Sequence, residues 1–323
     1  MQKILTILIL LSGTICTAQN ELFSRQYFLN HYLMNPAVGG INDYMDLRAS
    51  YSRQWTAIEN SPTSMLLTFN TNLAREKDQV LRYSPFEKRY TVSKGGLDYY
   101  QRRIKHGVGT KIIYDKINGF TYTDVTVSYA AHVPLTGAWT LSAGVGGGMS
   151  MSAMDLTGRY LGDESDPLLN GGKRNEMVPL VEAGVWLYST GPYIGASLTR
   201  YMEDPYDEEQ KTRYMNIYAT AGWQLPANQF VFVPSVMYKN DGYSGHNINV
   251  NAMLWFSDIA WAGASLRNLE NPSVHVGLLW RNTLELNYTY DVNKSEWGGS
   301  HEIGIAYRIW NKADDCKNKW YFK

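Results

Sequence analysis

Cysteine is almost absent from this chain, which has two cysteines among its 323 residues. The first, Cys16, lies in an apolar stretch at the N-terminus that we expect to be removed, so Cys316 would remain alone. One cysteine can form neither an intramolecular disulfide nor a cysteine-based metal site. The sequence therefore excludes a small fold stabilised by disulfides and a zinc site built from thiolates.

Net charge and long apolar runs are missing as well. The 30 Lys and Arg balance the 30 Asp and Glu, which argues against a nucleic-acid binder that relies on bulk positive charge. Beyond the N-terminus, no stretch reaches the roughly 18 apolar residues that a membrane helix needs. A membrane protein made of strands stays possible, because only every second residue of such a strand meets lipid. The 24 Tyr and 10 Trp fit either interfacial aromatic girdles or a large soluble β-sandwich.

Residues 1–18 have the layout of a cleavable signal peptide. One positive charge precedes a short apolar run and an exit of small residues, and the run is too short to span a bilayer as a helix. Cleavage at its end would make Gln19 the mature N-terminus. Cys16 raises the alternative of a lipoprotein, but Ile15 is a poor residue immediately before a lipidated cysteine.

Apolar and polar residues alternate with a period of two along nearly the whole mature chain. In residues 283–292 the alternation runs without a break, as expected of a strand with one apolar and one wet face. Pro234, within the ninth predicted strand, removes a backbone donor and suggests a bulge or a position at a barrel mouth. The fourteen predicted strands cover 43–55, 63–73, 104–115, 120–134, 138–153, 178–189, 192–201, 212–225, 229–239, 246–256, 259–269, 272–282, 283–292 and 300–310.

This pattern predicts an all-β fold, a transmembrane antiparallel β-barrel of about fourteen strands over residues 43–310. A soluble jelly roll would not explain the agreement between strand pattern and connection lengths described below. The asparagines at 247, 249 and 251 should then face the lumen. The clearest lipid-facing sets are Met65/Leu67/Phe69, Val125/Val127/Tyr129, Leu141/Ala143/Val145, Val181/Ala183/Val185/Leu187, Met215/Ile217/Ala219/Ala221/Trp223, Ile248/Val250/Ala252/Leu254 and Ile303/Ile305/Tyr307/Ile309.

Connection lengths indicate the orientation of the barrel. If the chain starts in the periplasm, the even-numbered connections lie there, and most of them are tight turns, as in bacterial outer-membrane barrels. The exception is the segment 74–103. From Arg75 to Lys105 it holds nine Lys and Arg against four Asp and Glu, which indicates either a solvated face or a basic partner surface. Its candidate contact residues are Arg89, Tyr99, Tyr100, Arg102 and Arg103.

Residues 19–42 lack strand alternation but are rich in aromatic residues, including Phe23, Tyr27 and Phe28. The pair Asn35-Pro36 favours a turn. An apolar segment that is not a strand must bury somewhere, so we expect it at the periplasmic mouth as a partial plug. The alternative is a loosely ordered arm. Residues 311–323 form a C-terminal tail.

Motifs that suggest chemistry have simpler explanations here. The run Gly144–Gly148 lacks the Lys-Ser/Thr and the helix of a phosphate loop, so it indicates small residues in a strand. The acidic residues at 163, 164 and 166 lack EF-hand spacing. His132 shares a lumenal stripe with Ser128 and Asp124, but no oxyanion donors are evident, so a lumenal polar network is favoured over a nucleophilic site. We expect no enzyme activity, cofactor or metal.

Several blocks resemble the PorP/SprF family, outer-membrane proteins of the type IX secretion and gliding systems of Bacteroidetes. The similarity spans nearly the whole mature chain, and the Asn-Pro-Ala and Arg-Gln-Trp blocks together are fairly specific. The segment 74–103 is longer than is usual in the family. The blocks are residues 23–30, Leu33-Met34-Asn35-Pro36-Ala37, Gly39-Gly40, Arg53-Gln54-Trp55, Pro62, residues 129–135 (with Ala131 where the family more often has an aromatic), 300–304 and Tyr307-Arg308.

The resemblance implies a non-enzymatic outer-membrane component that docks, routes or anchors secreted proteins with type IX C-terminal domains, such as adhesins. It also implies links to periplasmic components, including peptidoglycan-associated lipoproteins. Neither implication follows from strand periodicity. The alternatives are a porin-like diffusion channel, since fourteen strands can enclose a solute path, and an outer-membrane lipid hydrolase or protease, for which no site is evident.

Overall fold

The computed structural model describes residues 26–73, 104–135, 139–155, 173–201, 215–240, 246–257, 259–292 and 297–310. The predicted signal peptide, the basic segment 74–103 and the C-terminal tail lie outside these residues. Within the described residues, no helix is long and apolar enough to cross a membrane.

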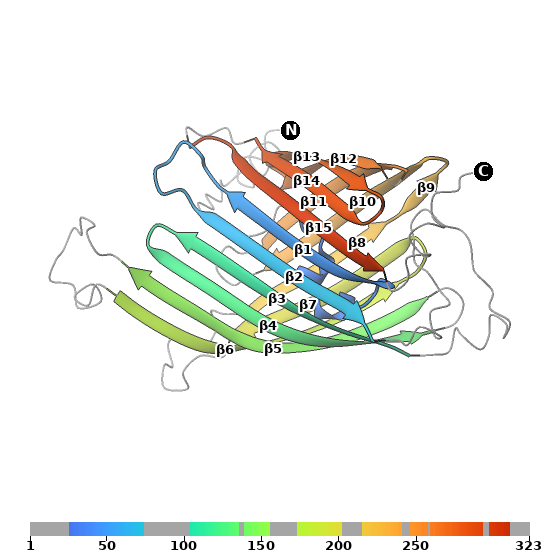
Figure 1. Cartoon of the computed structure of the whole chain (residues 1–323), viewed down its shortest axis with the longest axis horizontal. Helices are drawn as coiled ribbons and strands as arrows, with labels where there is room; N and C mark the ends of the chain where they lie inside the picture. Colours follow the sequence, from blue (N-terminus) through green and yellow to red (C-terminus); the bar gives the residue numbers. More distant parts are fainter. Residues whose placement is uncertain are drawn as a thin grey trace, which may run out of the picture.

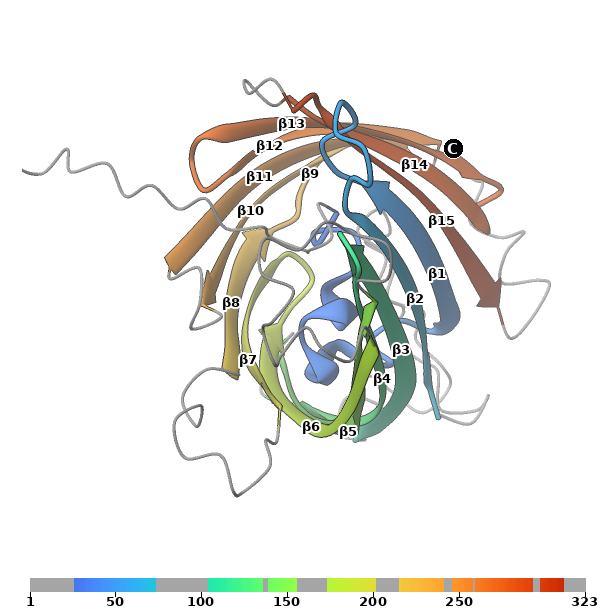
Figure 2. The same cartoon turned by 90° about the vertical axis from the view of Figure 1, so that its left-hand side faces the viewer.

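The strands form one closed antiparallel barrel, as predicted (Figures 1 and 2). Consecutive strands pair with each other, except that β8 and β9 both pair with β10; β15 pairs with β1, and β10 pairs with β11, so the circle is complete. Closure removes the free edges that would expose unpaired backbone groups to lipid. The strands are β1 Tyr44–Arg53, β2 Thr63–Asn72, β3 Lys105–Ile117, β4 Phe120–Pro134, β5 Thr140–Asp155, β6 Lys173–Tyr188, β7 Pro192–Tyr201, β8 Met215–Trp223, β9 Leu225–Ala227, β10 Phe230–Asn240, β11 His246–Phe256, β12 Ala260–Arg267, β13 Asn271–Trp280, β14 Leu284–Asp291 and β15 Ser300–Trp310.

β8 and β9 are two parts of one barrel strand, so the fifteen strand segments form a barrel of fourteen strands. The pairs Ser235↔Gly222 and Phe232↔Leu225 belong to the same register. The ladder is interrupted where Val233 and Pro234 lie opposite Gln224 and Trp223, without an inserted residue, so there is no bulge. Of the two predicted explanations for Pro234, the position near a barrel mouth agrees with its place close to the start of β10, at the end of the barrel where β1 begins. A proline removes one backbone donor, which is enough to break the pairing locally while the register continues.

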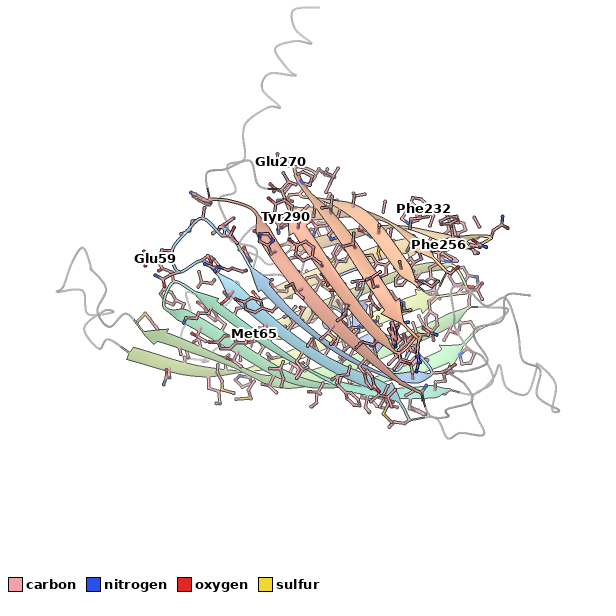
Figure 3. All side chains as sticks on the ribbon, turned by 45° about the horizontal axis from the view of Figure 1, so that its top comes forward. Glu59, Met65, Phe232, Phe256, Glu270 and Tyr290 are labelled. Carbon is pink, nitrogen blue, oxygen red and sulfur yellow. The ribbon has the colours of Figure 1, made fainter. Side chains whose placement is uncertain are left out.

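The outward face of the barrel is apolar, and the predicted lipid-facing sets are confirmed. Met65 and Val127 are 51% and 65% exposed, and Figure 3 shows the side chains of Met65, Phe232 and Phe256 on the outer face. The lumenal asparagines at 247, 249 and 251 are buried. A continuous apolar belt of this size is unusual for a water-soluble surface and is typical of a barrel that meets lipid.

The two ends of the barrel differ in their connections. We call the end where β1, β5 and β7 stop and β2, β6 and β8 begin the loop end; it includes the connection 54–62. The opposite end, where β1 begins and β15 stops, is the turn end, and it has short connections at 189–191, 228–229 and 281–283. The loop end lies on the left in Figure 1. Tight hairpins use residues with positive φ, such as Arg281 and Asn282, both at 51°, as two-residue turns require.

Candidate functional site

Residues 26–42, which we call the lumenal segment, lie inside the ring of strands (Figure 2). They include two short 3-10 helices, η1 (His31–Leu33) and η2 (Pro36–Val38). Side-chain and backbone contacts join them to strands β2 to β7 and β11 to β14. The described part of the segment thus lies within the lumen and is not confined to a mouth.

Asn35 and Pro36 shape the segment. The Asn35 side chain accepts a hydrogen bond from the Ala37 amide at 2.9 Å and so caps η2, while Pro36 occupies the first helical position. The Asn35 Nδ2 also donates to the carbonyls of Val185 and Ala196, at 3.0 and 3.1 Å. One side chain therefore starts the helix and attaches it to β6 and β7.

Tyr27 and Phe28 are buried in the lumen. The Phe28 ring packs edge-on against His275 and Trp261, with centroid distances of 4.7 and 6.2 Å. The Tyr27 hydroxyl donates to the Asn249 carbonyl at 3.4 Å. Burial raises the pKa of Tyr27, so the hydroxyl stays protonated. Of the aromatic residues predicted to pack together here, Tyr27 and Phe28 do so, and Phe23 lies outside the described residues.

Glycines in the barrel wall provide the space that η2 occupies. A Cβ on Gly144 would lie 2.4 Å from the Ala37 nitrogen, and a Cβ on Gly184 would lie 2.1 Å from the Asn35 Oδ1. On β3, a Cβ on Gly107 would lie 2.0 Å from the carbonyl oxygen of Gly39. Any side chain at these positions would push the lumenal segment away. The glycine run that sequence analysis attributed to small strand residues therefore includes a contact surface for η2.

Polar side chains of the wall bind the backbone of the lumenal segment. Ser142 donates to the Ala37 carbonyl at 2.6 Å, and Ser197 donates to the Met34 carbonyl at 2.7 Å. His132 bonds the Gly39 carbonyl at 2.9 Å through Nε2. Because 3-10 turns leave carbonyl groups without internal partners, these donors satisfy groups that burial would otherwise penalise.

The stripe that resembled a catalytic arrangement is part of this attachment. Ser128 shares a 2.7 Å hydrogen bond with the Tyr32 hydroxyl, and the second ring nitrogen of His132 bonds Tyr188 at 3.2 Å. Asp124 accepts from Ser150. Each member is thus engaged elsewhere, as the polar-network interpretation predicts.

A buried ion pair that sequence analysis did not single out lies next to this contact surface. Lys111 on β3 pairs with Glu182 on β6, and its Nζ also donates to the Leu33 carbonyl at 2.9 Å. Both side chains are almost fully buried. A charge buried in a barrel lumen needs a partner, and here the pair connects two wall strands to the lumenal segment.

A cavity of about 220 Å³ lies between η1 and the wall at the turn end; we call it the vestibule. Its walls include Trp186 and Tyr193, which stack at 5.2 Å and both contact the His31 ring. Burial, followed by the charge of Arg48, lowers the pKa of His31 to about 4. His31 is therefore neutral at physiological pH.

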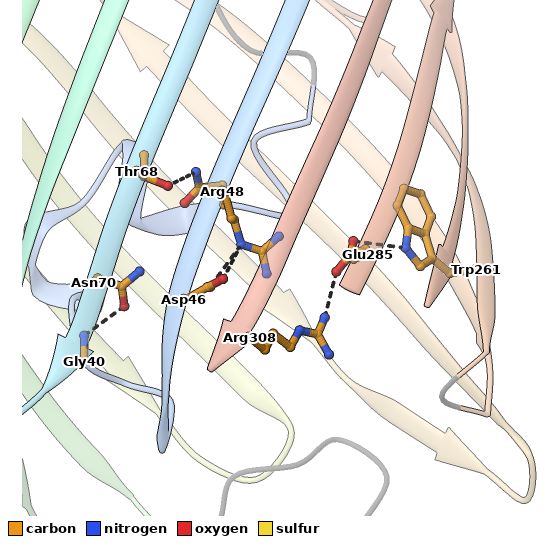
Figure 4. A network of polar contacts seen from close by, with 9 residues as sticks. Gly40, Asp46, Arg48, Thr68, Asn70, Trp261, Glu285 and Arg308 are labelled. Atoms are coloured by element: carbon orange, nitrogen blue, oxygen red, sulfur yellow. Dashed lines mark hydrogen bonds and ion pairs between the residues drawn. The ribbon is translucent and has the colours of Figure 1, made fainter. Parts of the chain in front are cut away.

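Four charged side chains line one side of the vestibule (Figure 4). Arg48 donates from Nε to both carboxylate oxygens of Asp46, at 3.1 and 3.0 Å. Arg308 donates to Glu285 at 2.7 Å, and the Trp261 indole donates to the other Glu285 oxygen at 3.3 Å. Asp46 and Arg308 face each other across β1 and β15. These charges could not be assigned to one site from sequence, because β1 is far from β14 and β15 in the chain.

The other predicted contact block lies at the opposite end. Arg53 donates to Ser61 at 2.7 Å, and Gln54 is buried. Trp55 packs edge-on against Trp297 at 4.9 Å, which joins the β1–β2 and β14–β15 connections. The structure therefore separates the candidates into two places. Arg89, Tyr99, Tyr100, Arg102 and Arg103 lie outside the described residues.

No cluster of His, Cys, Asp or Glu suited to a metal ion occurs in the described part of the chain. The acidic residues at 163, 164 and 166 fall outside it.

Comparison with known proteins gives one family match. The family model described as type IX secretion system membrane protein PorP/SprF matches residues 16–307. No curated protein matches the sequence. Among solved structures, the outer membrane protein Omp33 of Acinetobacter baumannii is similar, with 8% identity and a TM-score of 0.47, over 84% of this chain and 100% of that chain. A mutant of the Rh. blastica porin is also similar, with 8% identity and a TM-score of 0.35, over 82% and 99% of the two chains.

Proposed function

This chain belongs to the PorP/SprF family of type IX secretion system membrane proteins, and from that premise we propose that it works in the outer membrane without catalysing a reaction. Its role would be to dock, route or anchor secreted proteins that have type IX C-terminal domains. The observation that carries the proposal is the extent of the family match, residues 16–307, which includes both the barrel and the lumenal segment.

The filled lumen supports docking over diffusion. A barrel of fourteen strands has room for a solute path only if nothing else occupies it. Here residues 26–42 contact strands all round the wall, with Asn35, Tyr32 and Gly39 bound to β4, β6 and β7. A component that docks proteins has no need of an open pore, whereas a porin does.

The orientation we propose places the turn end in the periplasm. Short connections on that side and longer ones outside are the usual arrangement of bacterial barrels. Periplasmic partners, including other type IX components or a peptidoglycan-associated lipoprotein, would then meet the turn end and the segment 74–103. The block Arg53-Gln54-Trp55 would lie on the outer side.

The proposal is tested by deleting the gene and following a secreted reporter that carries a type IX C-terminal domain. We expect the reporter to accumulate in the periplasm, and complementation with the intact gene should restore its export. A reporter without the C-terminal domain is the control for general envelope damage. Normal export of the tagged reporter in the deletion strain would contradict the proposal.

The channel alternative has its own measurement. We expect the purified protein to be electrically silent in a planar bilayer, since the lumenal segment closes it. Steady open-pore currents from the unmodified protein would favour the channel.

A further inference from the structure

We propose that the vestibule binds the carboxyl end of a polypeptide chain, whose last residue carries an apolar side chain. The inference deepens the proposed function and rests on it for the identity of the partner as a secreted protein. It is carried by four features of the cavity: its size, the lumenal segment along its inner side, its donors without a hydrogen-bond partner among the described residues, and its apolar walls.

Size and shape limit what can enter. The cavity holds about 220 Å³, which equals roughly seven water molecules at about 30 Å³ each and is close to the volume of one large residue. Phe28, His31 and Tyr32 of the lumenal segment form its inner wall. A chain that passes through would need an exit on that side, so a linear polymer can enter only by one of its ends.

The unused hydrogen-bonding groups select the carboxyl end. Arg48 bonds Asp46 only through Nε, and no hydrogen bond from its two terminal nitrogens reaches another described residue. The Nε of Arg308 is buried and has no hydrogen-bond partner among the residues described. A guanidinium presents donors and no acceptor, in a fork that matches a carboxylate.

An amino end would meet the opposite situation. The two carboxylates of the cavity, Asp46 and Glu285, already accept from Arg48 and Arg308. An ammonium group would have to share carboxylates that already accept two hydrogen bonds each, and it would lie beside two guanidinium groups of like charge. Because the four charges cancel, the vestibule should not concentrate anions from solution, and the apolar part of the ligand must supply the rest of the affinity.

The remaining walls suit an apolar side chain. The cavity is also lined by Val231 of β10, Met253 and Trp255 of β11 and Leu279 of β13, in addition to the stacked rings of Trp186 and Tyr193. Val231, Met253 and Leu279 are each less than 10% exposed. A terminal aromatic or aliphatic residue would bury its side chain here and place its carboxylate toward the guanidinium of Arg48.

The test uses the full-length protein in detergent and a fluorescent eight-residue Gly/Ser peptide that ends in phenylalanine, with fluorescence anisotropy as the readout. The same peptide with an amidated end is the matched ligand. We expect the free acid to bind at least tenfold more tightly than the amide. Equal binding of the two, or no binding of either, would overturn the assignment.

Two paired variants locate the site. The double variant D46N/R48Q removes both members of a vestibule ion pair, so it leaves no buried charge alone, and it should abolish the preference for the free acid. The control R267Q/D291N removes the pair between Arg267 and Asp291, whose atoms lie 3.3 Å apart outside the cavity, and it should keep the preference. Heat-modifiable gel mobility confirms that each variant is a folded barrel. A preference that survives D46N/R48Q in a folded barrel would refute the site.

Two further measurements distinguish a partner's carboxyl end from a free anion and from the chain's own C-terminus. Excess inorganic phosphate that displaces the peptide completely would indicate a general anion site, and peptide binding seen only after removal of residues 311–323 would assign the cavity to the chain's own end. Either result overturns the proposal. The outcome is also independent of the proposed function, because the export experiment can succeed while the free acid and the amide bind alike.

Discussion

Replacing Gly144 by alanine tests whether the barrel wall is built around the lumenal segment. The new Cβ would lie 2.4 Å from the Ala37 nitrogen and 2.5 Å from the Pro36 carbonyl carbon. These are backbone atoms, so relief requires the whole of η2 to move by about 1 Å toward an ordinary contact distance. Such a move would stretch the 2.6 Å bond from Ser142 to the Ala37 carbonyl.

The expected size of the effect follows from the attachment. Six hydrogen bonds join residues 33–39 to wall strands. At about 1 kcal/mol each they favour the seated segment by about 6 kcal/mol, an unseated fraction of roughly four in a hundred thousand. Overpacking costs about 1–3 kcal/mol, so Gly144→Ala should raise the unseated fraction by about 5- to 150-fold. The variant should therefore show rare openings and not a permanent pore.

Gly147 in the same strand provides the matched control. A Cβ there would find only the Leu180 carbonyl oxygen, at an ordinary 3.7 Å. Single-channel recordings in planar bilayers should then show brief current steps for Gly144→Ala and a silent barrel for Gly147→Ala. Indistinguishable open probabilities for the two variants would refute the argument that the wall glycines hold the segment in place.

Three further predictions concern charge and orientation. Lys111→Met leaves Glu182 buried without its partner, and should destabilise the folded barrel by about 3–5 kcal/mol, measured as a lower unfolding midpoint. Adding Glu182→Leu should bring the midpoint most of the way back, and a double variant as unstable as the single one would contradict the pairing. The pKa of His31 is lowered from 6.5 to about 4, so its contribution is complete above about pH 6.5 and is lost as the pH falls toward 4. Protease access to the lumenal segment should rise over that range, and His31→Asn should reduce this pH dependence without abolishing it, because His132 and His275 also contact the segment. A profile that His31→Asn leaves unchanged would show that His31 does not contribute. Cysteines at Ser84 and Ser93, in the segment outside the described residues, should resist an impermeant maleimide on intact cells and react once the outer membrane is opened, whereas labelling of intact cells would invert the topology.

The barrel could be predicted from sequence because its signal is local and repeated. In a strand with lipid on one face and the lumen on the other, residues two positions apart share an environment. The alternation within one strand therefore predicts that Ile248, Val250 and Leu254 face outward, without information about the neighbouring strands. Closure adds no new requirement, since consecutive antiparallel strands pair in order. The alternatives for Pro234, a bulge or a mouth position, stayed open because a missing donor has the same sequence signature whether the ladder bulges or merely breaks.

The contact surface for the lumenal segment could be predicted only in part. The aromatic residues and Asn35-Pro36 indicated a buried, turn-containing segment, but its depth depends on which wall residues are small. Gly107, Gly144 and Gly184 lie on three different strands, and glycine in a strand has many explanations. The ion pair between Lys111 and Glu182 could not be predicted either, because its two residues are 71 positions apart in the sequence and only the barrel brings them into contact.

A barrel filled by its own chain restricts where a partner can act. With the lumen occupied, the accessible surfaces are the lipid-facing wall and the two ends. At the loop end, Trp55 and Trp297 use their rings to join two connections, so part of that apolar surface is already engaged. At the turn end, the vestibule has guanidinium donors for which the described residues offer no hydrogen-bond partner, beside an apolar wall. Leaving such donors unsatisfied is costly unless water or a ligand completes them, and this cost is the physical reason to look for the partner at the turn end first.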